Sequence, residues 1–321
     1  IDFEYVDKVN TDSIVDITVN SILENLDPHS LYIPSKSYED AASDMRGNFI
    51  GIGISFYQHQ DSIAVIRTIE GGPAQKAGIQ AGDRILYADT IPLFGKGLNR
   101  YDVVSQLKGT RNSKVSLKIK RKNQDSLLSI TVTRQKIPLV SLDAAYLLTD
   151  AIGYIKLNRF AEPTYSEFKK ALTALIDKGA TKLVLDLRDN PGGYISSAQD
   201  IVDEFLQDNT LILITKNKNG KQEKTYATNK GSFKTGSLYV LINENSASAS
   251  EIVAGALQDN DKGVIIGRRS FGKGLVQREM ALGDGSAVRL TIARYYTPTG
   301  RSIQKPYDKG NDAYHSEYES R

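Results

Sequence analysis

The stretch that decides the fold runs from Leu241 to Gln277 and reads LINENSASASEIVAGALQDNDKGVIIGRRSFGKGLVQ. It overlaps a predicted buried strand at 238–243, and its serines stand at three alternate positions, Ser246, Ser248 and Ser250. An apolar segment with helical spacing comes next, followed by a second apolar run at 264–266 and by Lys273 between two glycines. This order predicts strands alternating with helices, with polar side chains at the turn between the first strand and its helix.

Serine and lysine together indicate hydrolytic chemistry that needs no histidine. A serine at a helix start can act as a nucleophile, and the free N–H groups of the helix can stabilise an oxyanion beside it. A lysine that burial keeps neutral can take the proton of the serine. The residues alone leave open which of the three serines this is. Ser248 and Glu251 also match a capping box, which would only stabilise the helix N-terminus.

Lys273 needs an apolar pocket to act as a base, because an exposed lysine is protonated near neutral pH. An exposed lysine in a glycine turn is the alternative. The apolar residues predicted to supply the pocket are Val264, Ile265, Ile266, Phe271, Leu275 and Val276.

Composition restricts the class of protein. The chain has 321 residues, which suits two or three domains, and a net charge of +3 from 41 basic and 38 acidic residues. This balance argues against a nucleic-acid partner. Cysteine is absent, and the three histidines are scattered without metal-ligand spacing, so we expect neither a metal site nor another cofactor.

A second set of motifs lies in the first half of the chain. Short predicted strands surround one helical segment at 100–107, and the sequence Gly51-Ile52-Gly53-Ile54 resembles the carboxylate-binding loop of PDZ domains. GGPAQKAGIQAGDRIL at 71–86 is similar to the PDZ signature of proteases. Glycines let successive N–H groups face one anion, and an adjacent strand edge can accept a peptide. The predicted peptide-binding residues are Gly51, Ile52, Gly53, Ile54, Val103 and Leu107.

The chain order predicts four parts. A helical segment over 1–46 precedes the PDZ domain at 47–137, a core of alternating strands and helices spans 138–306, and a polar tail over 307–321 is expected to be loosely held. No apolar run reaches the roughly 18 residues that cross a bilayer. Because the chain opens at Ile1, a signal sequence can have preceded it.

These motifs, with DLRDNPGGY at 186–194, identify a resemblance to the carboxy-terminal processing proteases over nearly the whole chain. The resemblance implies an α/β (α+β) fold, with a crotonase/ClpP-like protease core, an inserted PDZ domain and an N-terminal helical segment. It implies Ser248 as the nucleophile, Lys273 as the general base and Gln277 as its assistant. The implied oxyanion hole uses the N–H of Ala249 and that of Gly193 or Gly192.

Two carboxylates are interpreted as structural. Asp186 interrupts an apolar strand and needs a partner, for which Arg188 is the candidate. Asp259 aligns with an acidic position of the family and is expected to stabilise the fold.

The resulting hypothesis is a serine endopeptidase that captures the free C-terminus of a protein or peptide substrate and cleaves it through an acyl-enzyme. The resemblance also implies an exported, periplasmic or envelope protein without an integral membrane segment in this chain, and homo-oligomers formed through the terminal segments. Two alternatives stay open: a non-catalytic peptide- or lipid-binding protein on the same fold, and an adaptor that presents tails to another enzyme. A trypsin-like protease with a PDZ domain is rejected, because the sequence lacks a GNSGG-type serine loop and a histidine positioned as its base.

Overall fold

The structure is a computed structural model that describes residues 4–59, 62–95, 97–310, 313–314 and 316. The chain divides into two compact units, one formed by Ile1–Gly47 with Val140–Arg321 and the other by Asn48–Leu139. The second unit closely overlaps the predicted PDZ segment. The N-terminal segment and the core, predicted as separate parts, share the first unit.

The N-terminal segment contains one long and one shorter helix with a short strand between them: α1 (Thr11–Glu24), β1 (Leu31–Ile33) and α2 (Ser35–Arg46). Asn10 caps α1 by accepting a hydrogen bond from Ser13 N, and the helix ends three residues before Asp27-Pro28, where proline cannot continue it. Val15 and Ile22, which recur at helical spacing in α1, are more than half exposed. None of the described helices combines the length and hydrophobicity of a membrane span.

The second unit is mainly a twisted antiparallel sheet. Its elements are β2 (Asn48–Gly51), β3 (Ile54–His59), β4 (Ser62–Thr68), α3 (Pro73–Lys76), β5 (Arg84–Ala88), β6 (Ile91–Pro92), α4 (Arg100–Leu107), β7 (Lys114–Lys120), β8 (Leu128–Thr133) and β9 (Gln135–Pro138). The sheet order is β3-β4-β5-β7-β8, so β3 lies at an edge, while β2 pairs with β9. The alternation in β7 buries Val115, Leu117 and Ile119 and exposes Lys114, Ser116, Lys118 and Lys120.

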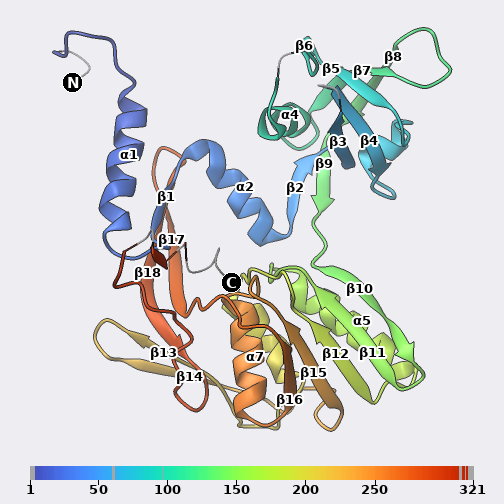
Figure 1. The fold of residues 1–321 in the computed structure, drawn as a ribbon. Coiled ribbons are helices and arrows are strands. Elements are labelled where there is room, and N and C mark those ends of the chain that lie inside the picture. The colour runs from blue at the N-terminus through green and yellow to red at the C-terminus, as the bar shows by residue number, and fades with distance from the viewer. Residues whose placement is uncertain (1–3, 60–61, 96, 311–312, 315, 317–321) are drawn as a thin grey trace. The chain divides into compact units, whose positions relative to one another are not determined.

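The core of the first unit is a five-stranded sheet in the order β10-β11-β12-β15-β16 (Figure 1). Its strands are β10 (Leu142–Thr149), β11 (Ile152–Leu157), β12 (Lys182–Asp186), β15 (Ser237–Ile242) and β16 (Gly263–Gly267). Four of these strands, β11, β12, β15 and β16, run parallel to one another, and β10 is antiparallel to β11. The carboxyl ends of β12 and β15 therefore meet at one edge of the sheet, where the NPGG loop and the serine turn begin.

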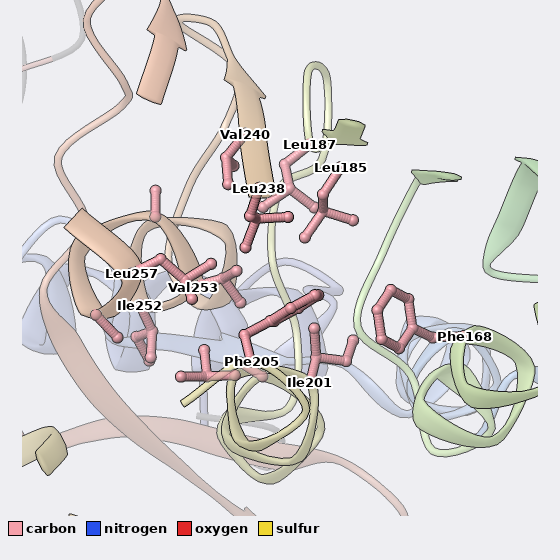
Figure 2. Close-up of a cluster of buried hydrophobic side chains, with 14 of the residues drawn as sticks. Phe168, Leu185, Leu187, Ile201, Phe205, Leu238, Val240, Ile252, Val253 and Leu257 are labelled. Atoms are coloured by element: carbon pink, nitrogen blue, oxygen red, sulfur yellow. The ribbon is translucent and has the colours of Figure 1, made fainter. Parts of the chain in front are cut away.

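Helices α5 (Thr164–Asp177), α6 (Ile195–Asp203) and α7 (Ala249–Asp259) pack beside one another and against this sheet. Apolar residues of the helices meet four side chains of the sheet layer. These are Leu185 in β12, Leu187 just after it, and Leu238 and Val240 in β15, and Figure 2 shows part of this cluster. The helix residues of the cluster shown there include Phe168, Ile201, Ile252, Val253 and Leu257, joined by Phe205. Burying these side chains stabilises the layer that positions the serine turn.

A second sheet of the first unit brings the two ends of the chain together. It contains β1, β13 (Leu211–Asn217), β14 (Gln222–Tyr226), β17 (Leu275–Ala281) and β18 (Ala287–Tyr296). Its order is β1-β18-β13-β14, and β17 pairs with β18. The strands β13 and β14 form a hairpin with Asn219-Gly220, a strong turn dipeptide, between them, and Gly220 adopts a positive φ of 78°. Because β1 and β17 both pair with β18, the N-terminal segment belongs to the same sheet as the strand that follows Lys273.

The buried sheet–helix interface predicts a difference between two leucines. Leu185→Ala removes a side chain with 0% exposure and should lower the free energy of unfolding by about 2–5 kcal/mol. Leu148→Ala, at a position that is 49% exposed on β10, should change it by less than about 1 kcal/mol. Urea unfolding followed by circular dichroism compares the two. Equal losses would contradict the assignment of Leu185 to the core.

Candidate active site

Two of the three serines are committed to the loop that carries them. Ser246 Oγ donates to Leu187 O at 2.7 Å and accepts from Asn243 N at 2.9 Å. Ser250 Oγ donates to Asn190 O at 2.9 Å, and both residues are fully buried. Ser248 is half-buried, and none of these hydrogen bonds uses its hydroxyl. Of the three serines, Ser248 is the one whose hydroxyl donates no hydrogen bond to a described residue, although its oxygen takes part in the capping box with Glu251 N.

Ser248 lies at the turn between β15 and the N-terminus of α7 (Figure 1). Its φ of 54° and ψ of −112° are unusual for a residue with a side chain. Backbone strain of this kind persists only where the surroundings impose it, and it is typical of functional turns. The N–H of the next residue, Ala249, has no hydrogen-bond partner within the described part of the chain. The Ser248 hydroxyl and an N–H group without a partner among the described residues thus stand side by side.

The NPGG loop supplies the second free N–H group. Gly192 N donates to Asn190 Oδ1 at 2.9 Å, so it is already occupied. Gly193 N has no such partner among the residues that the structure describes. A Cβ atom on Gly192, whose φ is +96°, would lie 2.8 Å from Ala249 N and 2.8 Å from Ser248 Cβ. The close approach explains the glycine at 192, and the free N–H favours Gly193 as the donor.

Asn190 joins the two loops. Its carbonyl oxygen accepts from Ala247 N at 3.1 Å and from the hydroxyl of Ser250, while its side-chain amide donates to Leu157 O at 3.0 Å. The side chain is fully buried. Asn190 therefore fixes the NPGG loop to the serine turn and to the end of β11. This attachment keeps the N–H groups of Ala249 and Gly193 in a fixed position relative to each other.

Lys273 has the environment that a lysine base requires. Burial lowers its pKa to about 8, and the nearby Arg289 cation also lowers it, whereas Asp27 and Glu251 act in the opposite direction. An amine with this pKa is neutral in a large fraction of molecules near pH 8. The predicted desolvation of Lys273 is therefore seen in the structure.

The amine of Lys273 donates to Gln277 Oε1 at 2.8 Å. Four residues in a straight strand span about 13 Å, so this contact needs a bend. The bend has two parts: β17 begins only at Leu275, and its pairing with β18 shifts register between Val276 and Gln277. Gln277 Nε2 in turn donates to His29 O at 2.6 Å. Among the described residues, no hydrogen bond joins Lys273 Nζ to Ser248 Oγ.

Two buried side chains hold the backbones of Ser248 and Lys273 together. Glu251 Oε2 accepts from Ser248 N and from Lys273 N, both at 2.9 Å. Tyr295 Oη lies 3.1 Å from Ser248 O and also contacts Lys273 O. Glu251 Oε1 accepts two further bonds, from Ser270 Oγ and Gly272 N, both at 2.7 Å. The two residues, distant in sequence, are thus attached to the same carboxylate and the same phenol.

The predicted apolar pocket is correct only in part. Leu275 is buried, and Val276 and Ile265 pack against the core. Val264 and Ile266 are about half exposed, because β16 is the edge strand of its sheet and their side chains face away from the helices. Phe271 instead belongs to a group of rings with His29 and Tyr314.

The two carboxylates interpreted as structural, Asp186 and Asp259, both have partners. Asp186 is fully buried and accepts from Arg188 and from Tyr154 Oη at 2.6 Å. Asp259 accepts from Thr299 N at 3.0 Å and pairs with Arg301. The described residues contain no group of three or more histidine, aspartate or glutamate side chains arranged to hold a metal ion.

In the second unit, the two PDZ motifs contact each other. Ile52 O accepts from Ala74 N, and Gly53 O accepts from Ile69 N, both at 2.9 Å. The carbonyl groups therefore face the GGPA segment, while the N–H groups of Ile52 and Gly53 have no partner within the described part of the chain. A positive φ of 76° at Gly53 permits this turn. The loop can thus present two N–H groups to an anion.

The predicted side chains of the peptide groove lie beside this loop. Ile52, Val103 and Leu107 are buried in the core of the unit, and Ile54 packs against it while partly exposed. Ile54 opens β3, and Gly51 closes β2. Because β3 is an edge strand, its outer side is open to an added peptide strand.

Sequence reasoning missed Glu251 as a link between serine and lysine, and it missed Tyr295 and the carbonyl of His29 altogether. The capping-box pattern located Glu251 correctly next to Ser248. The contacts of Glu251 with 270–273 and those of Tyr295 depend on tertiary packing, which leaves no local pattern.

Comparison with known sequence families agrees with this arrangement. The model of peptidase family S41 matches residues 151–310, and that of the PDZ domain matches residues 51–132. The first segment contains the serine turn, the NPGG loop and Lys273, and the second contains the glycine loop and α4.

Individual relatives extend the match to nearly the whole chain. The chain is 38% identical to a carboxy-terminal-processing protease of Bartonella bacilliformis over 94% of its own length and 69% of that protein. It is 33% identical to the carboxy-terminal processing protease CtpB of Bacillus subtilis, covering 94% of the chain and 63% of the relative. The solved structure of a photosystem II D1 C-terminal processing protease matches with a TM-score of 0.54 and 29% identity, over 93% of this chain and 81% of that one. The chain therefore belongs to peptidase family S41, among the carboxy-terminal processing proteases, which confirms the family and the mixed α/β fold that its motifs predict.

Proposed function

We propose that this protease is a serine endopeptidase with a Ser248–Lys273 dyad, and that its PDZ domain binds the free C-terminus of the substrate. The observation that carries the proposal is the shared hold of Glu251 on Ser248 N and Lys273 N. Because both N–H groups donate to the same oxygen, the distance between the two backbone nitrogens cannot exceed the sum of the two donor–acceptor distances. A hydroxyl and a largely desolvated amine are thereby kept in one small region.

In the proposed reaction, Ser248 Oγ attacks the scissile carbonyl carbon and its proton passes to Lys273 Nζ. Gln277 supports this step, because its Oε1 accepts one N–H of the amine and leaves the lone pair of the neutral amine directed elsewhere. A rotation of the lysine side chain is needed to bring that lone pair to the hydroxyl. The resulting ammonium protonates the leaving amine, and water then hydrolyses the acyl-enzyme.

The developing oxyanion would be stabilised by the N–H groups of Ala249 and Gly193. Neither donor has a partner in the part of the chain that the structure describes, and the close packing of Gly192 on Ser248 and Ala249 supports their location on one side of the nucleophile. The N-terminus of α7 adds a favourable dipole at the same place.

Capture of the substrate tail is proposed for the loop of residues 51–54. Its two free N–H groups suit a terminal carboxylate, and the open edge of β3 suits an extended peptide. The buried apolar residues beside it favour tails with apolar residues at alternate positions, once the groove opens to admit them.

The first test is cleavage of an unfolded protein by single variants. Ser248→Ala removes the nucleophile and Lys273→Ala removes the base, so each should lower kcat/KM by at least about 10³-fold. Ser166→Ala and Lys178→Ala, at exposed positions at the start and at the C-cap of α5, serve as matched controls and should leave the rate unchanged. Cleavage by either active-site variant at the wild-type rate would refute the dyad and favour an adaptor or binding protein.

The rate should also depend on pH through the base. Below its pKa, Lys273 is protonated and cannot accept a proton, so kcat should rise with pH and reach half its maximum near pH 8. Initial rates between pH 5.5 and 10 on a substrate without titrating groups provide the measurement. A rate that stays constant into the acidic range would exclude Lys273 as the base.

Recognition of the tail can be separated from cleavage. A peptide with a free C-terminus should bind the Ser248→Ala protein at least about tenfold more tightly than the same peptide amidated, because amidation removes the anion. Isothermal titration calorimetry on the full chain measures both dissociation constants. Equal affinities would refute carboxylate capture and leave the dyad untouched.

A further inference from the structure

The C-terminal segment, predicted to be loosely held, contains one fully buried side chain. Tyr314 is only 2% exposed, while its described neighbours Ala313 and Ser316 are exposed. Tyrosine buries a large apolar ring and usually satisfies its hydroxyl when it does so. The segment is therefore attached to the first unit at this side chain.

Tyr314 binds residues from both ends of the chain. Its Oη lies 2.8 Å from His29 Nε2, and the two rings meet edge to face with centroids 5.4 Å apart. Phe271 packs against both rings. The buried ammonium of Lys305 donates to Tyr314 O at 2.7 Å and lies 3.8 Å from the centre of its ring. We call these four residues the tail cluster: His29, Phe271, Lys305 and Tyr314.

The tail cluster contacts the loop of the base directly. Phe271 precedes Lys273 by two residues, and Lys305 N donates to Gly272 O at 2.9 Å. His29 is held from its other side by Asp27, whose Oδ1 accepts from His29 N at 2.9 Å. The carbonyl of His29 then accepts from Gln277 Nε2 at 2.6 Å. Gln277 is in contact with the amine of Lys273.

A continuous series of contacts thus joins the C-terminal segment to the base: Tyr314 to His29, His29 to Gln277, and Gln277 to Lys273. Gln277 has several rotatable bonds, and its position depends on its two hydrogen-bond partners. If His29 moves, the amide of Gln277 loses its acceptor, and water can replace it beside the amine.

We propose that Tyr314 is a positioning residue for the protease reaction: by docking on His29 and Phe271, the C-terminal segment holds Gln277 and Lys273 in the arrangement that the reaction requires. The segment thereby completes the active site from outside the serine turn, the NPGG loop and the lysine loop. Loss of the docked ring would admit water to the amine and restore part of its ordinary basicity.

The inference rests on the proposed role of Lys273, so its test needs a readout that does not depend on cleavage. The pH dependence of acetylation of the Lys273 amine by acetic anhydride, followed by peptide mass spectrometry, reports its protonation directly. In Tyr314→Ala, the midpoint should rise by at least about one pH unit. The cleavage rate at pH 8 should fall about tenfold or more, with the larger change in kcat rather than KM.

Two further variants make the test specific. Tyr314→Phe keeps the ring but loses the contact with His29 Nε2, so the midpoint should rise by a smaller amount in the same direction. Tyr307→Phe is the matched control, because this tyrosine lies in the same segment but its hydroxyl accepts from Arg294 at 3.1 Å, outside the tail cluster. It should leave both midpoint and rate unchanged.

The outcomes separate the two proposals. An unchanged acetylation midpoint in Tyr314→Ala would overturn the positioning role, as would a faster cleavage rate, which would indicate that the segment blocks the site. If Tyr314→Ala does not fold, by circular dichroism, the midpoint of Tyr314→Phe decides in the same way. If the wild-type protein fails to cleave while its Lys273 midpoint responds to Tyr314, the proposed function fails and the positioning of Lys273 stands.

Discussion

The structure of the active site depends on the carboxylate of Glu251. Glu251 is 3% exposed, and burial raises the pKa of its carboxyl group. Hydrogen bonds from Ser270 and from the backbone N–H groups of Lys273, Gly272 and Ser248 lower this pKa in part. All four partners are donors, two to each oxygen. Three of these partners are backbone N–H groups, which can only donate, so the arrangement suits the ionised form, while burial acts in the opposite direction. Four bonds to one buried anion make the relation between serine turn and lysine loop rigid.

The rigid relation explains why Ser248 can adopt a strained backbone. Its N–H is fixed by Glu251 and its carbonyl by Tyr295, and the residues on either side are tied to Asn190 through Ala247 N and Ser250 Oγ. Strain at one residue persists when the surroundings determine its conformation from several directions. The helix α7, buried along nearly its whole length, supplies the stable support on which this turn is built.

Much of this was accessible from the sequence where the signal is local. The helix at 100–107 was predicted with both of its ends, and the Asn219-Gly220 hairpin follows from turn chemistry. The serine turn, the lysine loop and the PDZ motifs were located through their spacing and the family resemblance. The choice between Gly192 and Gly193 was not accessible, because it depends on which N–H the buried side chain of Asn190 occupies.

The sequence-based predictions that differ from the structure share a physical cause. The C-terminal tail is polar in composition, and composition predicts a loosely held segment. Burial of Tyr314 depends on His29, which lies almost at the opposite end of the chain, and no local pattern records that contact. The same holds for Val264 and Ile266, whose apolar run indicates a buried strand although the sheet order puts β16 at an edge. Hydrophobicity predicts the strand, and only topology decides how it is covered.

The choice of partner for the lysine amine follows from the same electrostatics. Glu251 lies close enough to bind Lys273 through its backbone N–H, and its charge acts to raise the pKa of the amine, yet burial outweighs this effect and leaves the pKa at about 8. The amine itself contacts Gln277, a neutral amide. A carboxylate at that contact would form an ion pair with the ammonium and stabilise the protonated lysine. An amide accepts the same hydrogen bond without a full negative charge, so the site can orient the amine and still leave it free to lose its proton.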